Sequence, residues 1–175
     1  MLFKPFLTEI NKVMRKIDTH GVDTFVSEIK QAKRVFVIGV GRSGLVAKNL
    51  AMRLTRIHKQ TYVIYETVNP KMRKGDLLIA ISGSGETTDI IDSVKISRMM
   101  GTKVLGLTAD MQSPLAKLAH YCINIPAKIP SRLASHYHLR ELIGVPERSA
   151  TKSLFEICAL IFVEVGVSKL DNIEE

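Results

Sequence analysis

The sequence has no tryptophan and only two cysteines, Cys122 and Cys158. Their spacing matches no zinc site, and we expect both to be free thiols inside a protein of the reducing cytoplasm. No apolar run approaches the roughly 20 residues that a membrane-spanning helix needs, and the first residues lack the pattern of a signal peptide. These absences favour a cytoplasmic protein that has neither a membrane partner nor a metal site.

Acidic residues are fewer than basic ones, which leaves a net charge of +8 and a pI of about 9.6. Such a balance favours an anionic partner, either a nucleic acid or a small metabolite attracted by long-range steering. The basic side chains are spread along the chain, and no aromatic residue is interleaved with their densest group, Lys71 to Lys74. We therefore interpret the charge as a solvated surface and expect no nucleic-acid partner.

Short apolar runs rich in β-branched residues alternate with helical stretches over most of the chain. Because most of these runs are continuously apolar, they are typical of strands covered on both faces. The alternation predicts an α/β fold: a three-layer αβα sandwich with a five-stranded parallel sheet and flavodoxin-like topology. The predicted strands lie near 34–39, 61–65, 76–81, 103–108 and 121–125, with helices near 43–57, 86–100 and 113–119.

Helices are also predicted at both ends of what we interpret as a single domain, residues 1–175. Apolar positions at helical spacing over 6–31, interrupted at Gly21, predict two helices or one bent helix. The last helix is apolar on much of its circumference, so it must be buried in this subunit or against a partner, and we expect an oligomer. The predicted parts are N-terminal helices 1–32, a sheet core 33–126, a variable segment 127–148 and a C-terminal helix 149–170.

Two loops of small residues directly follow two of the predicted strands. They are Gly39-Val40-Gly41-Arg42-Ser43-Gly44 and Ser82-Gly83-Ser84-Gly85-Glu86-Thr87-Thr88. Parallel strands bring both loops to one edge of the sheet, where the following helices direct N–H groups and their positive ends at the loops. With the hydroxyls of the second loop, these amides suit a phosphate without a metal. We therefore predict a phosphorylated small molecule as the ligand; the alternative is a pair of tight turns with capping hydroxyls.

The first loop also matches the G-x-G-x-x-G pattern of dinucleotide-binding folds. Glu66 stands about 20 residues further on, where such a fold places the acid that binds the ribose. A nicotinamide dinucleotide is therefore an alternative ligand. The second loop argues against it, because a dinucleotide site does not need that run of hydroxyls and glycines.

In their strand context the two loops resemble the sugar isomerase (SIS) domain of phosphosugar isomerases and phosphosugar-binding regulators. The resemblance is carried by Val35–Ser43 and by Ile79–Thr87, and it covers most of residues 30–165. The first loop, the run Ala51-Met52-Arg53-Leu54 and the pair Phe155-Glu156 are most similar to 6-phospho-3-hexuloisomerases within that family. This similarity implies interconversion of 6-phospho-3-hexulose and fructose 6-phosphate, without a cofactor, by a homodimer or homotetramer.

The resemblance also implies roles for individual residues. Glu156 would be the general base and Arg42 would lie near the sugar; the alternative for Glu156 is a surface residue on the last helix. Isomerisation moves a proton between neighbouring carbons through an enediol(ate), for which one carboxylate and one cation suffice. The implied phosphate-binding residues are Ser43, Ser82, Ser84 and Thr87. Possible further substrate-binding residues are Gly41, Gly83, Gly85, Glu66, His136 and His138.

The segment before the last helix departs from the pattern of the resembled isomerases. They usually carry Pro-Met-Gly-Thr shortly before the catalytic glutamate, where this chain has Pro146-Glu147-Arg148-Ser149-Ala150-Thr151. The difference leaves open another aldose–ketose phosphosugar isomerase, or a sensor that binds a phosphosugar without converting it. His136 and His138 either assist proton transfer or lie at the surface; no third ligand accompanies them as a metal pair.

Overall fold

The computed structural model describes residues 3–128 and 153–171. Within these residues five strands form one all-parallel sheet in the order β2-β1-β3-β4-β5. This order confirms the predicted α/β fold and its flavodoxin-like topology. The strands are β1 (Val35–Gly39), β2 (Thr61–Val63), β3 (Leu77–Ile81), β4 (Lys103–Thr108) and β5 (Tyr121–Asn124).

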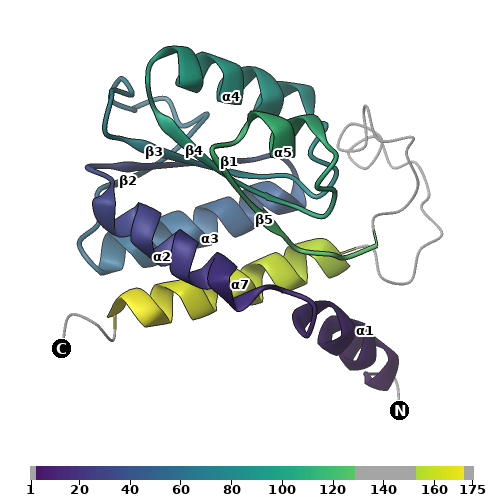
Figure 1. The fold of residues 1–175 in the computed structure, drawn as a ribbon. Helices are drawn as coiled ribbons and strands as arrows, with labels where there is room; N and C mark the ends of the chain where they lie inside the picture. Colours follow the sequence, from purple (N-terminus) through teal and green to yellow (C-terminus); the bar gives the residue numbers. More distant parts are fainter. Residues whose placement is uncertain (1–2, 129–152, 172–175) are drawn as a thin grey trace.

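Helices cover both faces of the sheet, which gives the three predicted layers (Figure 1). α4 and α5 lie over one face, whereas α2 and α3 lie over the other with α7 packed against them. In the described residues no helix is long and apolar enough to cross a membrane. The helices are α1 (Lys4–Met14), α2 (Thr19–Gln31), α3 (Arg42–Arg56), α4 (Thr88–Met99), α5 (Pro114–Leu118) and α7 (Leu154–Asp171).

The break between the first two helices differs from the prediction at Gly21. α1 ends at Met14, and α2 begins after Asp18, whose carboxylate accepts a hydrogen bond from the His20 N–H and caps the helix. Gly21 lies inside α2, and a Cβ there would stand 3.3 Å from the side chain of Ile123 in β5. The glycine therefore lets the helix pass close to the sheet and does not interrupt it.

Two hydrophobic cores lie on the two faces of the sheet. The larger core includes Phe25 of α2 and Phe162 of α7, whose rings meet edge to face with centroids 5.5 Å apart. The smaller core lies between the sheet and α4, around Phe36 and Ile90. Successive strand residues point to opposite faces, so Phe36 enters the smaller core and Val37 the larger. The continuously apolar runs of the sequence supply both cores at once.

The helix α7 closes the larger core. It contacts α1, α2 and α3, and most of its apolar side chains are buried in this subunit. Leu160 and Val165 remain 38% and 49% exposed. The predicted start of this helix, at residue 149, lies outside the described residues, as does nearly all of the variable segment 127–148; the described part of α7 runs from Leu154 to Asp171.

Both cysteines are free, one in a strand and one in a helix as the sequence predicted. Cys122 lies in β5 and is partly buried, whereas Cys158 lies in α7 and is fully buried. Burial raises the pKa of each thiol to about 11. Neither thiol is therefore appreciably ionised at neutral pH, and neither is an activated nucleophile.

Candidate functional site

The two glycine-rich loops leave the sheet side by side at its carboxyl edge. Strands β1 and β3 are parallel neighbours, and their register pairs Gly39 with Ile81, the last residue of each strand. From there the chain enters α3 on one face of the sheet and α4 on the other (Figure 1). This divergence is the topological switch point at which parallel α/β sheets bind ligands. The predicted juxtaposition of the two loops is confirmed.

The first loop makes a turn that only glycine accommodates well. Gly41 caps α3 with φ of 59° and ψ of −129°. A Cβ on Gly39 would stand 2.4 Å from the carbonyl oxygen of Ser43, so strand and helix could not approach as they do. Ser43 lies in the first turn of α3 and is buried, while Arg42 begins the helix. The loop therefore places a serine and an arginine at the positive end of α3.

The second loop turns several polar groups toward one another. The Ser82 hydroxyl accepts a hydrogen bond from the Gly85 N–H at 3.1 Å and lies 3.2 Å from the Thr87 hydroxyl. The Ser84 hydroxyl accepts from the Glu86 N–H at 3.2 Å. Thr87 is the N-cap residue of α4, yet its hydroxyl makes no capping bond within the described part of the chain. In the first turn of α4 the Ile90 N–H donates to the Thr87 carbonyl, whereas the N–H groups of Thr88 and Asp89 come before it, at the positive end of the helix that attracts an anion.

Gly85 allows the second loop to turn tightly next to α5. Its φ is 64°, and a Cβ there would stand 2.2 Å from Oγ of Ser113, the N-cap residue of α5. The Gly85 carbonyl in turn accepts a hydrogen bond from the Leu115 N–H at 3.0 Å. The loop is therefore packed tightly against the start of α5, and a larger residue at Gly85 would displace it.

An arginine and a carboxylate from distant parts of the chain meet next to the first loop. Nε of Arg42 lies 3.9 Å from Oε1 of Glu156, which belongs to the first turn of α7. Their side chains are 20% and 18% exposed, so both are largely enclosed but still reached by solvent. The contact arises because α7 packs along α3. The structure thus contradicts the alternative that Glu156 is an ordinary exposed residue.

Other predicted residues lie apart from this pair. Glu66 follows β2 at the same edge of the sheet, but it is exposed and forms an ion pair with Lys48 of α3 at 3.1 Å. His136 and His138 lie outside the described residues. In the described ranges, no group of three or more His, Cys, Asp or Glu side chains is arranged to hold a metal ion.

Thr108, to which no motif in the sequence gave a role, lies against the second loop. Its hydroxyl donates a hydrogen bond to the Gly83 carbonyl at 3.1 Å. Thr108 ends β4, the strand next to β3, so its side chain reaches the same edge of the sheet as the loop. Its place as a polar residue at the end of a third parallel strand is the one sequence signal that could have found it, although the sequence does not show its partner.

Comparison with known proteins places this geometry in a family. The SIS domain model matches residues 28–139. The 3-hexulose-6-phosphate isomerase of Mycobacterium gastri is 34% identical over 162 residues, which cover 93% of this chain and 77% of that protein. A Methanococcus jannaschii structure, from which a 3-hexulose-6-phosphate isomerase function was inferred, shares the fold with a TM-score of 0.77 and 24% identity, covering 96% of this chain and 90% of that one.

A further similar structure contains a bound sugar phosphate. The NanR protein of Vibrio vulnificus in complex with ManNAc-6P has a TM-score of 0.72 and 25% identity, over 94% of this chain and 58% of that one. The matched family model spans both glycine-rich loops and the strands that position them. This chain belongs to the SIS domain family.

Proposed function

We propose that the protein is a phosphosugar isomerase that interconverts 6-phospho-3-hexulose and fructose 6-phosphate. The observation that carries the proposal is the Arg42–Glu156 pair beside the first of two adjacent glycine-rich loops. A carboxylate and a cation are the two groups that an enediol(ate) mechanism requires. The similarity to 3-hexulose-6-phosphate isomerases supports this choice of substrate.

In the proposed complex, the phosphate lies between the two loops. Hydroxyl donors and the amides at the starts of α3 and α4 hold an anion well, because each is directed by a fixed backbone. Binding at this point anchors the far end of the sugar and leaves its keto end to be positioned by other groups. The proposed phosphate ligands are Ser43, Ser82, Ser84 and Thr87.

The proposed chemistry takes place at C2 and C3 of the hexulose. The Glu156 carboxylate removes the proton from C2 of the 3-ketose, and the electron pair forms the C2–C3 double bond of a 2,3-enediolate. The guanidinium of Arg42 stabilises the oxyanion while a proton passes from O2 to O3. Glu156 then returns its proton to C3, and the carbonyl forms at C2. The reaction involves no net oxidation, so we propose it without a redox cofactor.

The exposed apolar side chains favour a homodimer or homotetramer as part of the proposal. Phe3, which precedes α1, and Phe6 and Leu7 within it are 78%, 43% and 58% exposed, and α1 projects from the body of the subunit (Figure 1). Exposed apolar residues that gather on one element are typical of subunit contacts. Size-exclusion chromatography with light scattering will measure the subunit number; a monomer would contradict this part of the proposal.

A phosphosugar sensor is the second candidate. A structural neighbour holds ManNAc-6P in the same fold, so the architecture serves phosphosugar binding in more than one setting. A sensor would keep the second loop, with its hydroxyls, but would not need Glu156. An isomerase for another aldose–ketose phosphosugar pair would keep the second loop and Glu156.

A coupled assay separates these functions. Fructose 6-phosphate formed from 6-phospho-3-hexulose is converted to glucose 6-phosphate and measured by NADP⁺ reduction. Turnover by the wild type supports the isomerase. Thermal stabilisation by sugar phosphates without turnover of any ketose or aldose phosphate would favour the sensor. Stabilisation by a nicotinamide dinucleotide, with none by sugar phosphates, would contradict the phosphosugar site altogether.

A further inference from the structure

The backbone of the second loop is hydrogen-bonded to Thr108, the last residue of β4, and to the segment that follows it. The Gly83 carbonyl accepts two hydrogen bonds, one from the Thr108 hydroxyl at 3.1 Å and one from the Ala109 N–H at 3.0 Å. The Thr108 hydroxyl also accepts from the Asp110 N–H at 3.3 Å. Thr108 is fully buried, so water does not compete for these bonds. One hydroxyl thereby ties the loop to the turn that follows β4.

This tie fixes the direction of a loop amide. In a trans peptide the carbonyl of one residue and the N–H of the next point in opposite directions, and the described chain has no cis peptide. The Gly83 carbonyl points toward the end of β4, so the Ser84 N–H points away from β4. On that side of β3 lies β1, whose loop carries Gly41 and Ser43. The Ser84 amide is therefore aimed at the region between the two loops.

We propose that Thr108 is a positioning residue for phosphate binding. It acts through the Gly83 carbonyl to orient the Ser84 N–H toward the anion. This inference rests on the proposed function, because it assumes that a phosphate binds between the two loops. Thr108 would not touch the ligand, and it ends β4, whereas the two loops follow β1 and β3.

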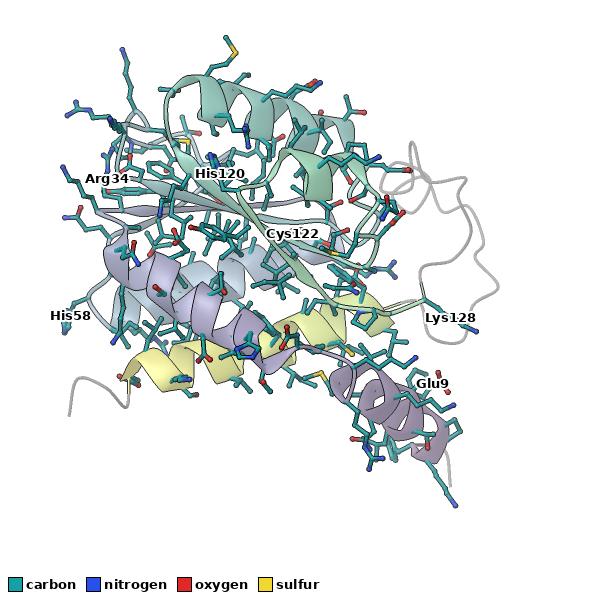
Figure 2. All side chains as sticks on the ribbon, in the orientation of Figure 1. Glu9, Arg34, His58, His120, Cys122 and Lys128 are labelled. Atoms are coloured by element: carbon teal, nitrogen blue, oxygen red, sulfur yellow. The ribbon has the colours of Figure 1, made fainter. Side chains whose placement is uncertain are left out.

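The alternative is that Thr108 only stabilises the fold, and the chain offers a matched control for that role. Thr102 stands just before β4, at the opposite edge of the sheet, and is also buried. Its hydroxyl donates to the Arg73 carbonyl at 3.5 Å. Arg34, which precedes the parallel strand β1, marks this opposite edge in Figure 2, far from Lys128 beyond the carboxyl end of β5.

The experiment compares three variants by titration calorimetry with inorganic phosphate and with fructose 6-phosphate. Thr108→Val removes the hydroxyl and keeps the shape, Thr108→Ser keeps the hydroxyl, and Thr102→Val removes a buried hydroxyl elsewhere. Losing one oriented hydrogen bond to an anion should weaken binding about tenfold. We expect this loss for both ligands in Thr108→Val, binding within about twofold of wild type in Thr108→Ser, and no change in Thr102→Val. Thr108→Ala is measured in parallel, in case the valine variant fails to fold.

The outcomes separate this inference from the function on which it rests. If the wild type binds both ligands and Thr108→Val binds them as Thr102→Val does, the positioning role is overturned while the phosphate site stands. If Thr108→Ser binds as weakly as Thr108→Val, the hydroxyl is not responsible and the role is again overturned. If the wild type binds neither ligand, the proposed function itself fails, and that result is obtained before any variant is measured.

Discussion

The carboxylate of Glu164 lies 3.1 Å from Nε of Arg53, which repeats along the same two helices the relation between Glu156 and Arg42. Eight residues separate the two glutamates, or about two turns of α7. Glu164 also accepts a hydrogen bond from the Asn49 side chain at 2.8 Å. One pair lies beside the first glycine-rich loop and the other lies further along the helices. The protein thus supplies its own control for the proposed base.

Replacing Glu156 by glutamine should abolish isomerisation and preserve binding. The amide cannot accept the proton from C2. The loss of a general base typically lowers the rate by about 10²–10⁴-fold, and we expect kcat to fall about 10³-fold. Glu164→Gln removes a carboxylate from the same helix and should leave kcat within about threefold of wild type. Coupled assays and fructose 6-phosphate titrations measure both. Equal kcat in the two variants would remove Glu156 from the mechanism.

Replacing Arg42 by methionine should lower kcat more than it weakens binding. The guanidinium is proposed to stabilise charge that develops only in the transition state, and removing such a group costs about 10²-fold in kcat. Arg42→Lys keeps the charge but loses the planar fork, so we expect an intermediate rate. Arg53→Lys, at the second pair, is the control and should match the wild type. A change confined to KM would show that Arg42 binds substrate without assisting the chemistry.

Gly85→Ala should destabilise the fold and abolish sugar-phosphate binding. The new Cβ would stand 2.2 Å from Oγ of Ser113 at a φ of 64°, and overpacking of this kind costs roughly 1–3 kcal/mol. Gly101 has a similar φ of 74°, but a Cβ there would stand 3.8 Å from the nearest atom, on Lys74. Gly101→Ala should therefore lose only about 1 kcal/mol to backbone strain. Thermal melts and phosphate titrations compare the two, and intact binding in Gly85→Ala would contradict a preformed loop.

His58→Gly should stabilise the protein without affecting the site. His58 follows α3 with φ of 62°, where its N–H bonds the Thr55 carbonyl while the Lys59 N–H bonds the Leu54 carbonyl, the pattern that favours glycine. Relief of strain is expected to add about 1 kcal/mol, or about 2–4 °C in Tm. His58 lies at the surface on the side of Arg34 in Figure 2, away from Lys128. His58→Ala keeps the Cβ and should show no gain; an equal gain would point to a different cause.

The stability of the fold should decline as pH falls below about 6.5 because of His120. Burial, with the charges of Arg98 and Lys103, lowers the pKa of His120 in the folded state, although Glu28 opposes the shift. Its Nδ1 accepts a hydrogen bond from the Val104 N–H and must be unprotonated to do so.

The unfolded chain therefore binds the proton first, so this contribution is complete above the unfolded pKa and is lost as pH falls through the folded one. His120→Asn keeps an acceptor that does not titrate. Denaturant unfolding of both proteins across pH 5 to 8, a range set by the ordinary pKa of histidine, should show a flatter profile for the variant. Parallel profiles would exclude His120 as the cause.

The parts of this protein that follow from local pattern were predicted from its sequence. Apolar runs gave the strands, and the glycine-rich segments between strand and helix gave both loops and their common edge. The interruption at Gly21 was predicted wrongly, because a glycine in a helix signals either a break or a close neighbour, and only the fold shows Ile123 beside it. Thr108 was missed for the same reason: its partner is the carbonyl of Gly83 in the second loop, 25 residues earlier, and local sequence does not encode such a contact.

The pairing of Arg42 with Glu156 has a consequence for the order in which the protein is made. Both loops leave the ribosome well before α7 is complete, so a nascent chain can form its sheet and phosphate-facing turns while the proposed base is still missing. The same helix that delivers Glu156 also covers Phe25 through Phe162 and closes the larger core. The packing of α7 therefore both closes that core and brings in the carboxylate, and a chain that stops short of α7 lacks the proposed base and leaves apolar side chains open to aggregation.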